Sequence, residues 1–146
     1  MSIADSHNRE QLRQSYVDAW RKRTARAIMS PLETMLADVI GEHPEYQPML
    51  LDADRALALD PGAEAVENPF LHMGLHMAVR EQLAIDRPPG VRGLHARLLA
   101  TYPDPHHAEH ILMEALAETL WEAQREGRGP DAMRYLELAR RRAGTT

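Results

Sequence analysis

The chain has 146 residues and no cysteine, which excludes disulfides, thiolate metal sites, iron–sulfur clusters and cysteine nucleophiles. The formal net charge is −5 at pH 7 with the eight histidines neutral, which argues against general nucleic-acid binding, because that function usually needs a basic surface. The length lies within the usual range of one compact domain and predicts a single helical domain over residues 1–146.

The hydrophobic segments indicate where the protein is found. The first residues are polar, so we expect no signal peptide. No apolar run approaches the ~20 residues that a membrane-spanning helix needs. Together with the lack of cysteine, these features predict a cytoplasmic protein with no membrane partner.

Prolines punctuate the chain, and most of them stand where a helix is expected to begin. Ser30 and Glu33 flank Pro31 in the pattern of a capping box, and Asn68-Pro69 and Asp104-Pro105 each place a cap residue before a proline. The apolar spacing predicts helices over 8–28, 30–41, 44–51, 68–85, 89–101, 104–126 and 130–142, with an irregular stretch over 52–67. No segment alternates as a strand does, so the predicted fold class is all-α, a compact helical bundle of about six to seven helices.

Two pairs of histidines stand four residues apart. His72 and His76 lie on the predicted helix over 68–85, and His106 and His110 lie on the one over 104–126. Residues four apart share one helix face, so each pair can hold a common ligand. Glu114 extends the second row by one turn. Short turns favour antiparallel neighbours, so we expect the two helices to run parallel, with both pairs at a similar depth.

These side chains suit a metal ion. Neutral imidazole is the commonest metal ligand in proteins, and nitrogen and carboxylate ligands without sulfur suit iron, manganese or zinc. The sequence therefore predicts a metal site of His72, His76, His106, His110 and Glu114, with iron as the first choice and zinc or manganese as alternatives. Two bound metals would allow oxygen or peroxide chemistry, whereas one metal with every position filled would be structural, so enzyme activity stays open.

The same residues also fit a metal-free interpretation. Buried imidazoles and a buried carboxylate need partners, and they can satisfy one another as a His–Glu polar network. The chain would then be a helical interaction or structural module whose apolar surface binds a partner or a second copy, which leaves a homodimer open. His43, His95 and His107 have no partner at a useful spacing, so we interpret them as surface or hydrogen-bonded core residues.

Three segments carry a resemblance to known proteins: SPLETMLADVIGEHPEY near residues 30 to 46, NPFLHMGLHMAVREQLAIDRPPG from residue 68, and AEHILMEALAETLWEAQREG from residue 108. In them the chain resembles a proteobacterial family of short all-helical proteins, a domain of unknown function. The resemblance covers most of the chain and implies a bacterial origin and no particular activity. In its ligand arrangement the chain is also similar, by analogy, to hemerythrin-like and ferritin-like helical metal proteins, although helix count and motif spacing depart from both.

Overall fold

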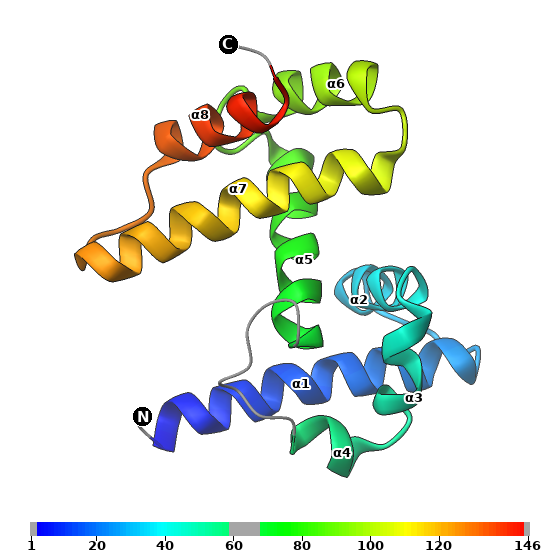
Figure 1. Ribbon diagram of the computed structural model, residues 1–146. Helices are drawn as coiled ribbons and strands as arrows, with labels where there is room; N and C mark the ends of the chain where they lie inside the picture. Colours follow the sequence, from blue (N-terminus) through cyan, green and yellow to red (C-terminus); the bar gives the residue numbers. More distant parts are fainter. Residues whose placement is uncertain (1–2, 59–67, 145–146) are drawn as a thin grey trace. The chain divides into compact units, whose positions relative to one another are not determined.

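The regular elements of the protein are all helical. A computed structural model describes residues 3–58 and 68–144, and each regular element within those ranges is a helix, which confirms the all-α prediction. In chain order they are α1 (Ile3–Thr24), α2 (Pro31–Gly41), the 3-10 turn η1 (Pro44–Tyr46), α3 (Gln47–Leu50), α4 (Ala53–Leu57), α5 (Pro69–Ile85), α6 (Val91–Thr101), α7 (Pro105–Glu126) and α8 (Ala132–Arg142) (Figure 1).

The predicted cap residues begin the helices that matter for the site. The Ser30 hydroxyl accepts the backbone N–H of Glu33 at 3.1 Å, and the Glu33 carboxylate accepts that of Ser30 at 2.9 Å, so the capping box is complete. The Asn68 side chain accepts backbone N–H groups of the first turn of α5, and Asp104 does the same for α7. Both histidine-bearing helices therefore start where local chemistry predicts.

The boundaries differ from the prediction at α1, which spans Ile3–Thr24 where 8–28 was expected, and between residues 44 and 58. The expected single helix there is η1 followed by the one-turn α3, and the expected irregular stretch contains α4. Asp52 caps α4 by accepting the backbone N–H of Arg55 at 3.2 Å. A helix of five residues is too short to show a helical period, which is why the pattern did not predict it. The rest of that stretch, 59–67, lies outside the described residues.

The chain falls into two compact units, Met1–Met77 (unit 1) and Ala78–Thr146 (unit 2), and the division lies within α5. In unit 1, α1 packs against α2, α3 and α4. Apolar side chains from these helices and from the start of α5 form its buried core, which includes Tyr16, Val17, Leu36, Val39, Ile40, Leu50, Phe70 and Met73, with Trp20 packed against it.

A buried arginine ties three segments of unit 1 together. The Arg13 side chain is almost fully buried, and its Nη1 lies 3.4 Å from the carbonyl oxygens of both Ala56 and Leu57 at the end of α4. Its guanidinium also lies 4.9 Å from the ring centroid of Phe70 on α5. A cation suits this place because the last carbonyls of a helix carry partial negative charge.

In unit 2, α6 and α8 pack on α7. Arg134 on α8 donates two hydrogen bonds of 3.1 Å to the Glu122 carboxylate on α7. The last turns of α5, which belong to this unit, cross α7 in Figure 1, and Arg80 Nε donates to Glu109 Oε1 at 2.9 Å. The expectation that the two histidine-bearing helices run parallel is therefore wrong. The turn after α5 passes through Asp86 (φ 51), a left-handed residue that redirects the chain and that helical periodicity does not report.

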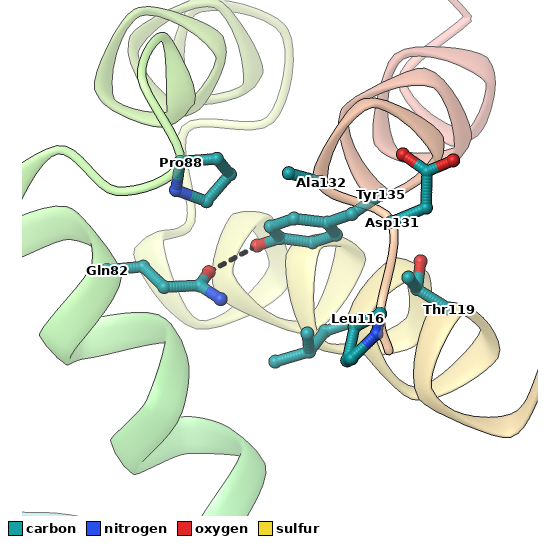
Figure 2. A pocket seen from close by; sticks show the side chains of 8 residues that line it. Gln82, Pro88, Leu116, Thr119, Asp131, Ala132 and Tyr135 are labelled. Atoms are coloured by element: carbon teal, nitrogen blue, oxygen red, sulfur yellow. Dashed lines mark hydrogen bonds between the residues drawn. The ribbon is translucent and has the colours of Figure 1, made fainter. Parts of the chain in front are cut away.

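A small cavity lies where the end of α5 meets α7 and α8. The hydroxyl of Tyr135, a buried side chain on α8, donates to Gln82 Oε1 on α5 at 2.7 Å, as Figure 2 shows. The bond borders a cavity of about 140 Å³ that Leu116 and the buried Thr119 on α7 help to line. Desolvation raises the pKa of Tyr135, so the phenol stays protonated as a donor at neutral pH.

Trp121 marks the outer face of α7. Its side chain is 57% exposed, and the Arg125 guanidinium lies 4.4 Å from its ring centroid.

None of the helices that the structure describes combines the length and apolar composition that crossing a bilayer requires.

Candidate metal centre

Three imidazoles gather in unit 1. His72 and His76 come from the first half of α5, and His43 follows the end of α2 as the residue before η1. The ring centroid of His43 lies 5.0 Å from that of His72 and 4.8 Å from that of His76, and the last two are 4.9 Å apart. His43 and His76 are buried, and His72 is partly buried. We call these three residues the unit 1 histidine cluster.

Hydrogen bonds orient the rings of this cluster and place the proton of His43. His43 Nδ1 lies 2.8 Å from the carbonyl oxygen of Val39, and because a carbonyl only accepts, Nδ1 carries the proton. In the neutral ring the lone pair then lies on Nε2, the nitrogen available for a metal. The Nε2 atoms of His72 and His76 are 3.2 Å apart, so one of these rings donates to the other.

Tyr46 covers one side of the cluster. Its ring stacks on that of His43, with centroids 5.2 Å apart and planes 6° from parallel. Desolvation raises the pKa of Tyr46, and the nearby charge of Glu45 adds to the effect, so the phenol is neutral at physiological pH. A neutral aromatic ring packed on an imidazole limits its rotation without adding charge to the cluster.

Unit 2 contains a separate pair of imidazoles. His106 and His110 lie on the first turns of α7, both partly buried, with ring centroids 4.3 Å apart. The spacing of four residues thus brings both predicted pairs together, each within its own unit.

Glu114 is exposed, unlike the partly buried His106 and His110. Its side chain is 63% exposed, and its carboxylate lies 3.4 Å from Nη1 of Arg142 on α8. The expectation of a buried carboxylate at Glu114 is therefore wrong. Each step of four residues rotates the side chain by about 40° around the helix, so a row that is partly buried at His106 reaches solvent two steps later.

His43 is the member that sequence spacing missed. No histidine or carboxylate stands four residues before or after His43, so the i, i+4 pattern could not identify it. Its burial follows from the end of α2, where the apolar Val39 and Ile40 enter the core of unit 1. The signal in the sequence was the His43-Pro44 pair that ends α2 directly after an apolar turn.

Comparison with known proteins places the chain in a family. A family described as a domain of unknown function (DUF1841) matches residues 8–141, nearly the whole chain. The chain belongs to the DUF1841 family. No curated protein and no solved structure matches it. The family description names no activity, so the function of this DUF1841 protein must be argued from its own side chains.

Proposed function

We propose that this DUF1841 protein binds a first-row transition-metal ion through the imidazoles of the unit 1 histidine cluster, His43, His72 and His76. One observation carries the proposal: ring nitrogens of His43 and His76 lie within 4.8 Å of each other, and the Nε2 atoms of His72 and His76 are 3.2 Å apart. His43 and His76 are buried and His72 is partly buried, so water competes weakly for the ion. Neutral imidazoles at such a spacing are ordinary ligands of divalent metals.

Only small side-chain movements separate these nitrogens from a coordination sphere. A tetrahedral ion with nitrogen ligands at about 2.0–2.1 Å holds them roughly 3.3 Å apart. Rotation of the imidazoles would close the remaining distance. Metal-bound histidines generally donate their other N–H to a carbonyl or a similar partner, which orients the ring. The carbonyl of Val39 supplies that support to His43.

The proposed ligand set differs from the sequence-based one. His43 is added, Glu114 is left out because it is exposed, and the pair His106 and His110 is treated separately because it belongs to unit 2. With three imidazoles and no carboxylate, iron and zinc fit better than manganese, which prefers oxygen ligands. Iron at an open position would permit oxygen or peroxide chemistry, whereas zinc in a closed site would be structural.

Metal content in protein purified without a histidine tag tests the proposal. We expect stoichiometric iron or zinc, and after chelation we expect the apoprotein to bind either ion again. Loss of one ligand in His43→Ala or His72→Ala should weaken binding at least tenfold, because loss of supporting groups alone has effects of that size. His95→Ala is the matched control, because His95 is a partly buried histidine on α6 outside the site. This variant should bind the metal ion as tightly as the parent does. A parent with the same affinity as His43→Ala for both ions would contradict the proposal.

A metal-free polar network is the second candidate. The bonds from His43 to Val39 and between His72 and His76 show that imidazoles in unit 1 find partners without an ion. The sequence predicted that the network would include the carboxylate of Glu114, but that side chain is exposed and is not part of a buried network. In this case His76→Ala would lower the free energy of unfolding by stranding a buried partner, and a chelator would leave the stability of the parent unchanged.

A further inference from the structure

A hollow of about 430 Å³ opens on unit 2, and side chains of both charges line it. Its volume is in the range of small-molecule sites. The lining combines a guanidinium, a carboxylate, two imidazoles, a phenol and an aliphatic side chain, which belong to Arg142, Glu114, His107, His110, Tyr102 and Ile111. All of these residues lie in unit 2, so the hollow is formed within one compact unit.

We propose that the hollow binds a free α-amino acid with an apolar side chain. An occupant with only a negative charge would be attracted by Arg142 but repelled by Glu114, and an occupant with only a positive charge would meet the reverse. A zwitterion offers a carboxylate to Arg142 and an ammonium group to Glu114. In an α-amino acid both groups stand on the same carbon atom, which suits two side chains that lie in contact. The inference is independent of the metal site proposed in unit 1.

Arg142 and Glu114 are placed so that both can contact the same small molecule. Nη2 of Arg142 donates to Glu118 at 2.6 Å, whereas its Nη1 lies 3.4 Å from the carboxylate of Glu114. The bond to Glu118 therefore orients the guanidinium, and the contact with Glu114 is long for a charge-assisted hydrogen bond. A guanidinium has several N–H donors and a carboxylate accepts several hydrogen bonds, so the pair can stay together and also bind a ligand. A zwitterion at this pair completes a ring of alternating charges.

The rest of the lining suits an apolar side chain on the ligand. Ile111 is buried and lines the hollow, and the rings of Tyr102 and His107 pack with centroids 4.9 Å apart. Removing the side chain of leucine or a similar amino acid from water against these groups favours binding. The side chain of Glu114 is 63% exposed and that of Arg142 37% exposed. Water therefore screens both charges, and we expect affinity in the millimolar range.

Histidine ring signals in NMR spectra of the full chain, recorded during titration with leucine, test the inference. We expect saturable shifts of the His107 and His110 signals, which His107→Gln and His110→Gln identify by removing them. The signal of His95, which does not line the hollow, should not shift. Two analogues of leucine each lack one charged group: isocaproate lacks the ammonium group, and isoamylamine lacks the carboxylate. Each should bind about two- to fivefold more weakly than leucine, the effect of losing one partly exposed charge pair.

Variants of the two charged residues should act on different ligands. Arg142→Gln should weaken leucine about two- to fivefold without weakening isoamylamine, and Glu114→Gln should weaken leucine by a similar factor without weakening isocaproate. Arg141→Gln is the matched control, because Arg141 stands beside Arg142 in the last turn of α8 and does not line the hollow. His43→Ala is a second control, because it removes a ligand of the metal site proposed in unit 1. Both controls should bind leucine as the parent does.

Three results would overturn the inference. The first is a titration in which leucine shifts neither the His107 nor the His110 signal. The second is equal affinity for leucine and its two analogues, which would mean an apolar contact without recognition of charge. The third is loss of leucine binding in His43→Ala, which would mean that leucine binds through a metal ion. A folding defect would weaken all three ligands alike, so it cannot produce the expected pattern.

Discussion

The hydrogen bond between Tyr135 and Gln82 offers a test of how unit 2 is held together. Tyr135 is buried on α8, and its hydroxyl donates to the Gln82 amide oxygen on α5 at 2.7 Å. Tyr135→Phe removes the donor and keeps the ring, so packing is preserved. The substitution therefore isolates one polar contact between the end of α5 and α8.

The adjacent cavity decides the size of the effect. A typical hydrogen bond contributes about 1 kcal/mol net, and a buried acceptor left without a donor costs about 1–3 kcal/mol. The cavity beside the hydroxyl measures about 140 Å³, well above the roughly 30 Å³ that one water occupies in the liquid. Water can therefore replace the hydroxyl beside Gln82, and we expect a loss of about 1 kcal/mol, or about 3 °C in melting temperature for a chain of this size.

Urea unfolding followed by circular dichroism measures this loss. A double-mutant cycle with Gln82→Leu should give a coupling energy of about 1 kcal/mol between the two residues. Tyr102→Phe is a suitable control, because Tyr102 is only partly buried, and it should change stability by less than about 0.5 kcal/mol. A coupling energy near zero, or Tyr135→Phe as stable as the parent, would refute the reasoning.

Three further predictions follow from other parts of the structure. Burial raises the pKa of Tyr16 to about 12 from its ordinary 10.0, so its contribution to stability is complete below pH 10 and is lost as the pH rises toward 12. Tyr16→Phe should flatten that loss in alkaline unfolding, and an unchanged profile would contradict it. Ser30→Ala should cost about 1 kcal/mol in urea unfolding, with Ser30→Gly costing only a few tenths. Metal at a hundredfold excess over the dissociation constant of the parent should add about 2.7 kcal/mol to the parent and at most about 1.4 kcal/mol to His43→Ala, whose affinity is at least tenfold weaker. Calorimetry with and without chelator would measure this difference, and acid should mimic the chelator.

The sequence predicted the helices well because their starting signals are local. A cap residue satisfies backbone N–H groups two or three positions away, so Ser30, Asn68 and Asp104 could be recognised without any tertiary information. The direction in which α5 meets α7 depends instead on the dihedral angles of the turn after α5 and on contacts such as Arg80 with Glu109. These are long-range consequences of folding that helical periodicity does not contain.

The residues of the candidate site were likewise predictable only in part from the sequence. The pairs His72–His76 and His106–His110 were predictable, because a spacing of four residues keeps two side chains on one helix face. Extending the row to Glu114 exceeded the range in which that rule holds, since the rotation accumulates with each step. His43 reaches His72 and His76 only because α2 ends beside the first half of α5 in unit 1, which no spacing rule describes.

Each unit contains one of the chain's two tryptophans, and this gives each unit its own optical signal. Trp20 packs against the core of unit 1, whereas Trp121 lies exposed on α7 beneath Arg125. Trp20→Phe and Trp121→Phe would therefore each leave one fluorophore, in unit 2 and unit 1 respectively. The partly buried ring of Trp20 would report unfolding as a shift in emission wavelength, and the exposed ring of Trp121 would report the loss of its contact with Arg125. Coincident unfolding curves from the two single-tryptophan proteins would mean that residues 1–146 unfold as the single domain predicted from chain length, and separated curves would mean two domains that share a helix.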